Sequence, residues 1–467
     1  MKVLARPSPR LSRRTKTCGR LSTARLSTAA ASVTEEHPSA DATSTTADPS
    51  LHPQYPRLFS PLDLGPDIGL LPNRALMGSM HSGLEGHSMP RWMQSLFMMG
   101  NNGKNKHHDN DLQAMATYFK ERAAGGVGIM VTGGIAPSYQ GWTGPFSSQL
   151  TTDAERDLHT VVTDAVHSVN VRIYGSPDNQ AVPARICLQI LHTGRYAYHP
   201  WAVSASKTRS PISPFTASAL SKRGIDQTTR DFVNTAVLAK QAGYDGVEIM
   251  GSEGYLLSQF LAPRTNKRTD DYGGSLPNRA RLALDIVQQT RQAVGPDFII
   301  IFRLSLLDLV QDGLSFDEAV QMAHWLQDAG ATILNTGIGW HEARVPTIAT
   351  AVPRGAFSFP TAALRQAAGP ELTLPLVATN RINHPATAER VLANDEVNLI
   401  SMARPFLADP ELINKSRDNR TDEINTCIGC NQVRFVLSFH AWDESTPNYA
   451  KKCTQILLTD LYFHSHP

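Results

Sequence analysis

The sequence has few cysteines, little net charge and no long apolar run. Five cysteines among 467 residues are too few and too unevenly spaced for a secreted disulfide framework, which indicates a reducing compartment. A net charge of +2 gives no support to nucleic acid or an acidic membrane as a partner. No stretch approaches the roughly 18 consecutive apolar residues that a membrane span requires. Hydrophobic residues still make up 41% of the chain, which is ample for a sizeable core.

The N-terminal segment has a one-sided charge. Eight Lys and Arg residues precede Glu35, the first acidic residue, and the segment is rich in Ser, Thr and Ala. This composition predicts an organellar transit peptide, with the mitochondrial matrix favoured over the plastid, and a basic tail as the alternative. Residues 38–56 resemble a Ser/Thr/Pro linker. We therefore expect residues 1–50 to be leader and linker.

Short apolar runs alternate with segments of helical period from Arg74 onward. Near-continuous apolar character is typical of parallel strands that are buried on both faces. Eight such runs are expected to be strands: residues 75–80, 129–134, 186–191, 246–251, 299–305, 332–337, 374–380 and 399–405.

The segments between these runs suit helices, most clearly residues 229–242, 278–294 and 316–329. Eight βα units predict an α/β protein of the TIM (β/α)8-barrel class, occupying residues 55–420. A doubly wound sheet is the runner-up, but the G-x-G-x-x-G fingerprint of that fold is absent after the early strands.

Polar or glycine-rich positions follow every predicted strand, where barrel enzymes carry their chemistry. Arg381 and Arg404 follow the last two strands, a common place for a phosphate, and Arg can bind phosphate oxygens through two N–H groups. Gln189 and Arg303 suit the polar edge of a heteroaromatic ring. Tyr255 and His341 are candidate proton donors. This set favours a flavin mononucleotide reductase over an aldolase, because the strand ends carry no lysine.

Six motifs strengthen this interpretation. LPNRALMGSMH at 71–81, QILHTGR at 189–195, GSEGYL at 251–256 and RTNKRTDDYGG at 264–274 resemble the Old Yellow Enzyme family. Within that family, NTGIGWHEAR at 335–344 and CIGCNQ at 427–432 resemble the NADPH-dependent 2,4-dienoyl-CoA reductases of the iron–sulfur flavoprotein type. The resemblance covers about residues 58–432 and implies an FMN-binding TIM barrel.

The resemblance also implies roles for individual residues. Tyr255 matches the proton donor and His341 its partner. Substrate contacts are implied for His192, Arg264, His341, Glu342, Ala343 and Arg344. FMN contacts are implied for Ser79, Met80, His81, Gly134, Gln189, Arg303, Arg381, Ala403 and Arg404.

The implied reaction is the reduction of a 2,4-dienoyl-CoA thioester in fatty-acid β-oxidation, with NADPH as the ultimate reductant. Two alternatives stay open: an ene-reductase that uses NAD(P)H directly, and a non-catalytic FMN-binding barrel or folding-impaired fragment. No nucleic acid and no transmembrane segment are expected, and the oligomeric state is open.

The chain departs from the iron–sulfur reductases at the cysteines. Cys427 and Cys430 match the first two ligands of a C-x2-C-x3-C pattern, but Arg434 occupies the third position and Cys453 does not fit the fourth. We therefore expect an incomplete [4Fe–4S] motif; a zinc half-site or a dithiol are weaker alternatives. Arg195 is a candidate buried ion-pair partner.

The resemblance stops at Gln432. We expect residues 421–467 to be a remnant of the iron–sulfur segment with a divergent tail and no FAD domain. A truncated or mis-spliced product, or a gene model that reads through an intron after Gln432, would explain this tail. Two insertions, at about 86–112 and 174–183, also depart from the family, and the first is a candidate lid. His107, His108 and Asp109 within it fit a solvated loop better than a metal site.

Overall fold

The computed structural model describes residues 50–89, 112–393 and 395–430, all of which lie in the compact unit Ala47–Pro467. Several predictions fall outside these residues: the transit peptide, most of the candidate lid with His107, His108 and Asp109, and the tail after Cys430.

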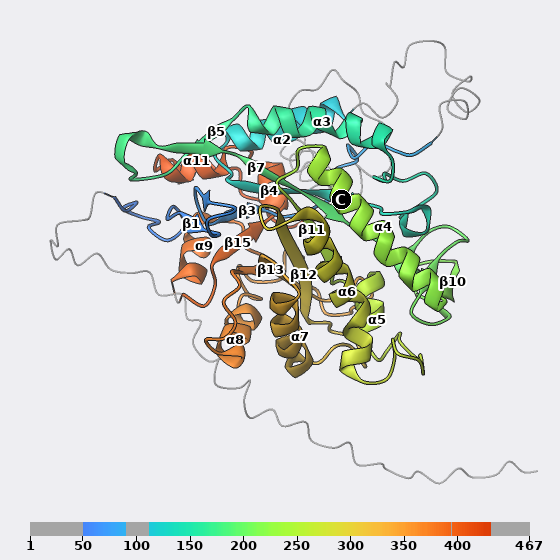
Figure 1. Ribbon diagram of the computed structural model, residues 1–467. Coiled ribbons are helices and arrows are strands. Elements are labelled where there is room, and N and C mark those ends of the chain that lie inside the picture. Colours follow the sequence, from blue (N-terminus) through green and yellow to red (C-terminus); the bar gives the residue numbers. More distant parts are fainter. Residues whose placement is uncertain (1–49, 90–111, 394, 431–467) are drawn as a thin grey trace, which may run out of the picture. The chain divides into compact units, whose positions relative to one another are not determined.

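Eight parallel strands form a closed barrel, which confirms the predicted fold class (Figure 1). Each strand pairs with the next along the chain, and the last pairs with the first. Every barrel strand overlaps one of the eight predicted runs. The strands are β3 (Ala75–Met77), β4 (Ile129–Ile135), β7 (Arg185–Ile190), β11 (Gly246–Gly251), β12 (Ile299–Leu307), β13 (Ile333–Ile338), β14 (Leu376–Ala378) and β15 (Leu399–Met402).

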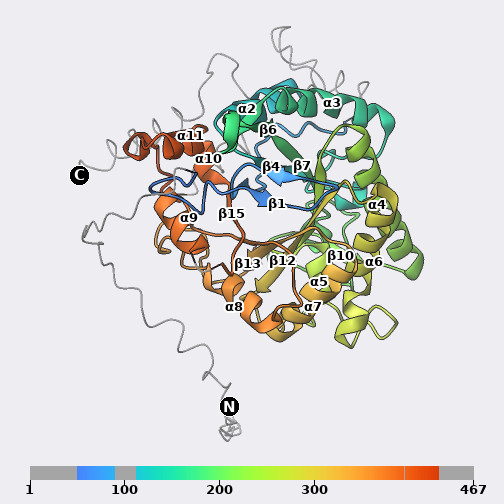
Figure 2. The same cartoon turned by 60° about the vertical axis from the view of Figure 1, so that its left-hand side comes forward.

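Helices surround the barrel strands (Figure 2). They are α2 (Gln113–Ala124), α3 (Asp153–His167), α4 (Lys222–Gln241), α5 (Leu256–Leu261), α6 (Leu276–Val294), α7 (Phe316–Asp328), α8 (Phe359–Ala368), α9 (Pro385–Leu392), α10 (Arg404–Ala408) and α11 (Leu412–Arg417). The three predicted helices are α4, α6 and α7. Helix α4 begins earlier than predicted because the side chain of Ser221 accepts a hydrogen bond from the Gly224 N–H and caps it.

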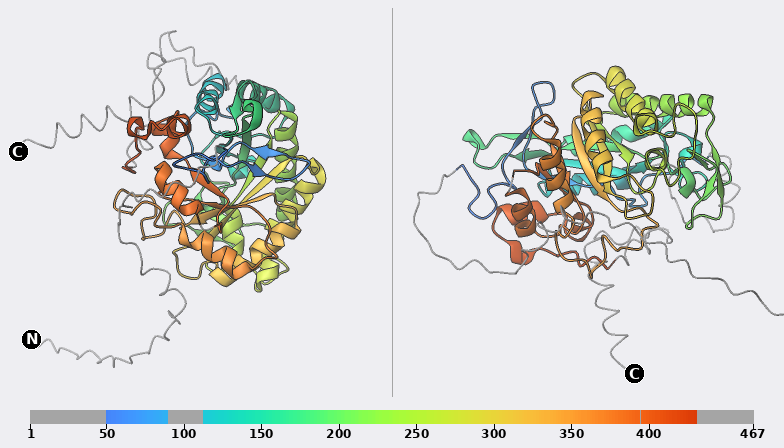
Figure 3. Two further views of the ribbon diagram at one scale, coloured as in Figure 1. Left: turned by 90° about the vertical axis from the view of Figure 1, so that its left-hand side faces the viewer. Right: turned by 90° about the horizontal axis from the view of Figure 1, so that it is seen from below.

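A short hairpin closes one end of the barrel. Strands β1 (Leu62–Asp63) and β2 (Leu70–Leu71) pair antiparallel and cross the opening in Figure 3. Leu62 and Leu71 pack in one cluster with the apolar side chains at the starts of the barrel strands, including Leu76 and Ile129. The amino-terminal end is thereby filled with apolar side chains, which leaves the carboxyl ends of the strands for a site.

The remaining strands lie outside the barrel. The predicted insertion at 174–183 ends in β6 (Ala181–Pro183), which pairs antiparallel with β5 (Asn170–Arg172). The excursion after β7 forms a small sheet of β8 (Val203–Ser204), β9 (Thr208–Arg209) and β10 (Thr216–Ala219). Among the described residues, no helix is long and apolar enough to cross a membrane.

Candidate active site

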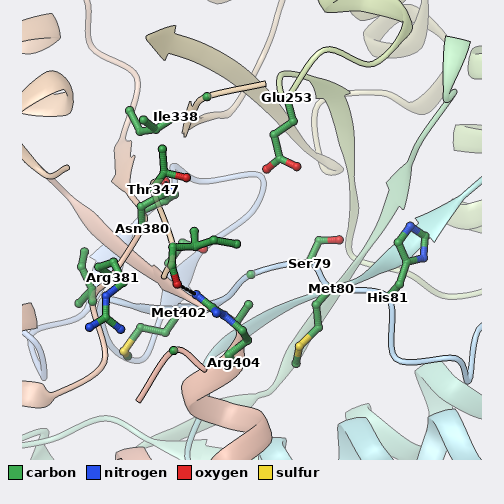
Figure 4. A pocket seen from close by; sticks show the side chains of 18 of the residues that line it. Ser79, Met80, His81, Glu253, Ile338, Thr347, Asn380, Arg381, Met402 and Arg404 are labelled. Atoms are coloured by element: carbon green, nitrogen blue, oxygen red, sulfur yellow. Dashed lines mark hydrogen bonds between the residues drawn. The ribbon is translucent and has the colours of Figure 1, made fainter. Parts of the chain in front are cut away.

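A cavity of about 440 Å³ lies at the carboxyl ends of the barrel strands. Residues within or directly after seven of the eight strands line it, with β4 the exception. Figure 4 shows the pocket with Glu253 directed into it from one side and Arg381 and Arg404 placed on the other. The size is within the range of about 300–1,000 Å³ that is usual for small-molecule sites.

Arg381 and Arg404 both line the cavity and form its cationic end. Asn380 and Arg381 both have positive φ values, 68° and 58°, so the chain turns sharply as β14 ends. Backbone carbonyls hold the two guanidinium groups: Arg381 Nε donates to Val352 O at 2.8 Å and Arg404 Nη2 to Ile348 O at 3.0 Å. Two arginines fixed in this way suit an anionic group such as phosphate.

Gln189 is positioned by a buried polar network inside the barrel. Its Nε2 donates to Glu248 Oε1 at 2.7 Å, and Asn335 Nδ2 donates to Glu248 Oε2 at 2.6 Å. Glu248 is fully buried between the two amides. Because Nε2 of Gln189 is engaged, its carbonyl oxygen is the group that remains to accept a hydrogen bond from a ligand.

Arg303 lies on β12, which is separated from the strand of Gln189 by β11, and is paired with Glu253. Its Nη2 is 2.7 Å from Glu253 Oε1, and burial, which disfavours its charge, is outweighed by Glu253 and Glu248, so its pKa is raised above the ordinary value. Glu253 has a φ of 61°, an uncommon conformation for a residue with a side chain. The sharp turn after β11 directs this carboxylate into the cavity (Figure 4).

Tyr255 and His341 meet at the cavity wall. The Tyr255 hydroxyl lies 2.7 Å from His341 Nε2, and Glu253 Oε2 lies 3.5 Å from the same nitrogen. The ring of Tyr196 contacts both rings edge-on. The phenol is thus held between an imidazole and an apolar cluster that includes Leu191, Met250 and Trp340. A phenol beside an imidazole can deliver a proton, because the imidazole can stabilise the phenolate that remains.

Glu342 fixes the segment that carries His341. Its two carboxylate oxygens lie 2.7 Å from Arg195 Nη2 and 2.8 Å from Arg264 Nε. The side chains of Glu342 and Arg195 are 3% and 4% exposed, whereas that of Arg264 is 35% exposed. The expected ion-pair role of Arg195 is therefore present in the structure.

The other predicted residues divide into two groups. Ser79, Met80, His81, Ala403 and Ala343 line the cavity. Gly134, His192, Arg264, Glu342 and Arg344 are outside its lining.

Gly134 and His192 lie behind the cavity wall. A Cβ on Gly134 would come within 2.7 Å of Leu191, so the glycine permits close packing of β7. His192 is buried, and its Nδ1 accepts from the Gly194 N–H; burial lowers its pKa to about 3. Neither residue is part of the cavity lining.

Sequence reasoning missed three contributions. Glu248 and Asn335 lie within strands, and their shared network was not predicted. The loop 345–349 lines the cavity between the two arginines and the proton-donor pair. No sequence motif predicts the position of this loop. A charged or amide residue inside an apolar strand, such as Glu248 or Asn335, is a signal from which the polar network could have been predicted.

Cys427 and Cys430 both line the cavity as free thiols. Within the described ranges, no group of three or more His, Cys, Asp or Glu residues could hold a metal ion. The remaining described cysteine, Cys187, is buried in β7. A four-thiolate cluster is therefore a poor fit to these residues.

Flavin mononucleotide, by contrast, fits the cavity. Arg303 Nε and His81 Nε2 are buried without hydrogen-bond partners among the described residues, and both residues line the cavity. Buried donors of this kind are normally satisfied, so they indicate a polar ligand. Together with Gln189 and the Arg381–Arg404 end, they match a ligand with a polar ring edge and a phosphate.

Comparison with known proteins decides the family. Residues 93–423 match the NADH:flavin oxidoreductase / NADH oxidase family. The chain belongs to this family. The resemblance to Old Yellow Enzymes is thereby confirmed at the level of the family, while the dienoyl-CoA reductase type remains a prediction.

Three relatives illustrate the similarity. A metal reductase of Desulforamulus reducens is 37% identical over 319 residues, which cover 68% of this chain and 45% of the relative. An NADPH dehydrogenase of Halalkalibacterium halodurans is 30% identical over 301 residues, 63% of this chain and 80% of the relative. The solved structure of a 2-naphthoyl-CoA reductase with 2-naphthoyl-CoA is 27% identical with a TM-score of 0.68, covering 80% of this chain and 54% of that one. The chain spans about half the length of several relatives that it matches.

Proposed function

We propose that this protein is an FMN-dependent reductase of conjugated C=C bonds, with a 2,4-dienoyl-CoA thioester as its substrate. The observation that carries the proposal is the Tyr255–His341 pair, 2.7 Å apart, on the wall of a cavity that also holds Arg303, Gln189 and the two arginines of the cationic end. A proton donor and a flavin-sized polar site in one cavity are what the reduction of an activated double bond requires.

Different residues of the cavity bind the cofactor and donate the proton. Arg381 and Arg404 would hold the phosphate of FMN, and the carbonyl of Gln189 and the guanidinium of Arg303 would bind the polar edge of its ring. The chemistry that bound, reduced FMN would supply is hydride donation to the far end of the diene. Tyr255 then donates its hydroxyl proton to the carbon nearer the thioester. An Nε2–H of His341 donates to the resulting phenolate, which lowers the cost of that charge.

A thioester conjugated with a diene is the substrate class favoured by two considerations. Its carbonyl withdraws electrons, so the distant carbon accepts a hydride. The NTGIGWHEAR segment resembles that of dienoyl-CoA reductases, and the 2-naphthoyl-CoA reductase, whose structure is similar, has a conjugated acyl-CoA as its ligand. Ala343 on the cavity wall and, outside its lining, Arg344 and the partly exposed guanidinium of Arg264 are then the groups proposed for the thioester end. The proposed role is in fatty-acid β-oxidation, and the Arg- and Ser-rich, acid-poor leader supports the mitochondrial matrix as the location.

A second candidate is an ene-reductase in which NAD(P)H reduces the bound flavin directly. The match to an NADPH dehydrogenase over 80% of that protein's length favours it. Both candidates share the cavity and the proton donor, and they differ in the source of electrons.

The experiment that separates them uses purified protein with saturating FMN under anaerobic conditions. Loss of flavin absorbance on addition of NADPH alone supports the second candidate. Absorbance that is lost only with dithionite and returns on addition of a 2,4-dienoyl-CoA supports the first. Protein that binds no FMN, or reduced protein that no activated alkene reoxidises, would refute both.

A further inference from the structure

The two cysteines on the cavity wall have no role in the proposed reaction. Cys427 and Cys430 are partly exposed free thiols, three positions apart in the sequence. Both side chains belong to residues that line the same cavity as Arg381 and Arg404. Among the described residues, no third metal ligand accompanies them.

The segment that joins the two thiols is held in a defined conformation. Asn383 Nδ2 donates to the carbonyl of Cys427 at 2.6 Å, which ties the motif to the loop after β14. Gly429 is buried with a φ of +74°, a conformation that favours glycine. A Cβ there would lie 2.7 Å from Arg381 Nη1, so the guanidinium packs directly against this turn. The segment between the cysteines is thus fixed at both Cys427 and Gly429.

We propose that Cys427 and Cys430 are a redox-active dithiol that forms a reversible intrachain disulfide on the cavity wall. Cysteines with two residues between them are suited to this bond, and a glycine between them eases the turn. The co-substrate is a small disulfide of the glutathione class. This inference does not depend on the proposed reductase activity, so a protein without ene-reductase activity could still form the bond.

The chemistry balances without a metal. The thiolate of one cysteine attacks a sulfur of the small disulfide, which releases one small thiol and leaves a mixed disulfide. The second cysteine then attacks the protein sulfur of that mixed disulfide and releases the second small thiol. The two protein sulfurs lose two electrons in total, and the two small thiols carry away those electrons and the two protons.

Cys187 provides an internal control within the chain. It is fully buried in β7, and burial raises the pKa of its thiol well above the ordinary value. A thiol in that environment is a poor nucleophile in the folded protein. It should therefore stay reduced in buffers that oxidise the Cys427–Cys430 pair.

The test is alkylation of the full-length protein, with and without FMN, after equilibration in glutathione buffers of increasing oxidising strength. After unfolding, free thiols are alkylated and mapped by mass spectrometry. We expect Cys427 and Cys430 to lose alkylation together, in a cross-linked peptide lighter by two hydrogens, while Cys187 remains alkylated. In C427S, glutathione should persist as an adduct on Cys430, because the second thiol is missing.

Two results would overturn the proposal. One is wild-type protein in which the two cysteines are still alkylated independently, or retain separate glutathione adducts, in the most oxidising buffer. The other is purified protein that contains iron and sulfide in cluster amounts and loses both in C427S.

Discussion

The hydroxyl of Tyr255, after β11, lies 2.7 Å from Nε2 of His341, after β13. The two residues are 86 positions apart in sequence, and they meet because β11 and β13 both pair with β12 in the barrel. This contact gives the phenol a partner that can share its charge once the proton has left.

Replacing Tyr255 by Phe removes the proton and leaves the ring. We expect reoxidation of the reduced flavin by a dienoyl-CoA to slow by a factor on the order of a hundred to ten thousand. FMN affinity should be unchanged, because the hydroxyl is paired with His341, which is not one of the predicted FMN contacts. The matched control is Tyr174→Phe, since that ring packs against His52 and Phe59. Equal rates for Tyr255→Phe and the control would remove Tyr255 from its role.

Replacing Arg381 or Arg404 by Ala should weaken FMN binding. A charge-assisted hydrogen bond contributes about 1.5–3 kcal/mol, so each substitution should raise the Kd about 10- to 100-fold. Arg381→Lys should recover only part of the loss, because an ammonium lacks the planar fork. Quenching of FMN fluorescence measures the affinity, with the exposed Arg223→Ala as control. A Kd for Arg381→Ala equal to that of the control would place the phosphate elsewhere.

The Glu342→Gln substitution should destabilise the protein. It leaves the Arg195 guanidinium buried without its charged partner, and breaking a buried pair costs about 3–5 kcal/mol. Arg264→Ala should lower the free energy of unfolding by less than about 1 kcal/mol, because Arg264 is partly exposed and the ion pair of Glu342 with Arg195 remains. Urea unfolding monitored by circular dichroism gives both values. A smaller loss for Glu342→Gln than for Arg264→Ala would contradict the described ion pairs.

Stability should fall in mild acid because of buried histidines. Burial lowers the pKa of His159 to about 4, below the ordinary value of 6.5, and its Nδ1 lies 2.8 Å from the Tyr244 hydroxyl. The unfolded chain binds a proton there as the pH drops below 6.5, while the folded protein does not until about pH 4. The free energy of unfolding should therefore decrease over this interval, by about 1.4 kcal/mol per pH unit for each such group.

His159→Gln should make that decrease shallower, whatever its constant effect on stability. The measurement is urea unfolding at pH 7, 6 and 5 for both proteins. Parallel curves would show that His159 takes up its proton equally in the folded and unfolded states.

The sequence allowed the barrel to be predicted because each strand is a compact apolar run followed by a polar end. Arg381, Arg404, Gln189 and Arg303 were identifiable by their position after or within a strand. Contacts between side chains of different strands could not be predicted from the sequence. The Glu248 network, for example, depends on the barrel register that places Glu248 beside Gln189. The loop 345–349 has no pattern that predicts its place over the cavity.

In the proposed function, Tyr255, assisted by His341, donates the proton when a conjugated thioester is reduced in an FMN-containing cavity. Its most direct test is stopped-flow reoxidation of the FMN-loaded, dithionite-reduced protein, mixed anaerobically with a 2,4-dienoyl-CoA or with the saturated acyl-CoA of equal length. The account predicts that flavin absorbance returns rapidly with the dienoyl-CoA, remains bleached with the saturated thioester, and returns far more slowly in Tyr255→Phe. Identical traces for the two thioesters, or for wild type and Tyr255→Phe, would contradict it.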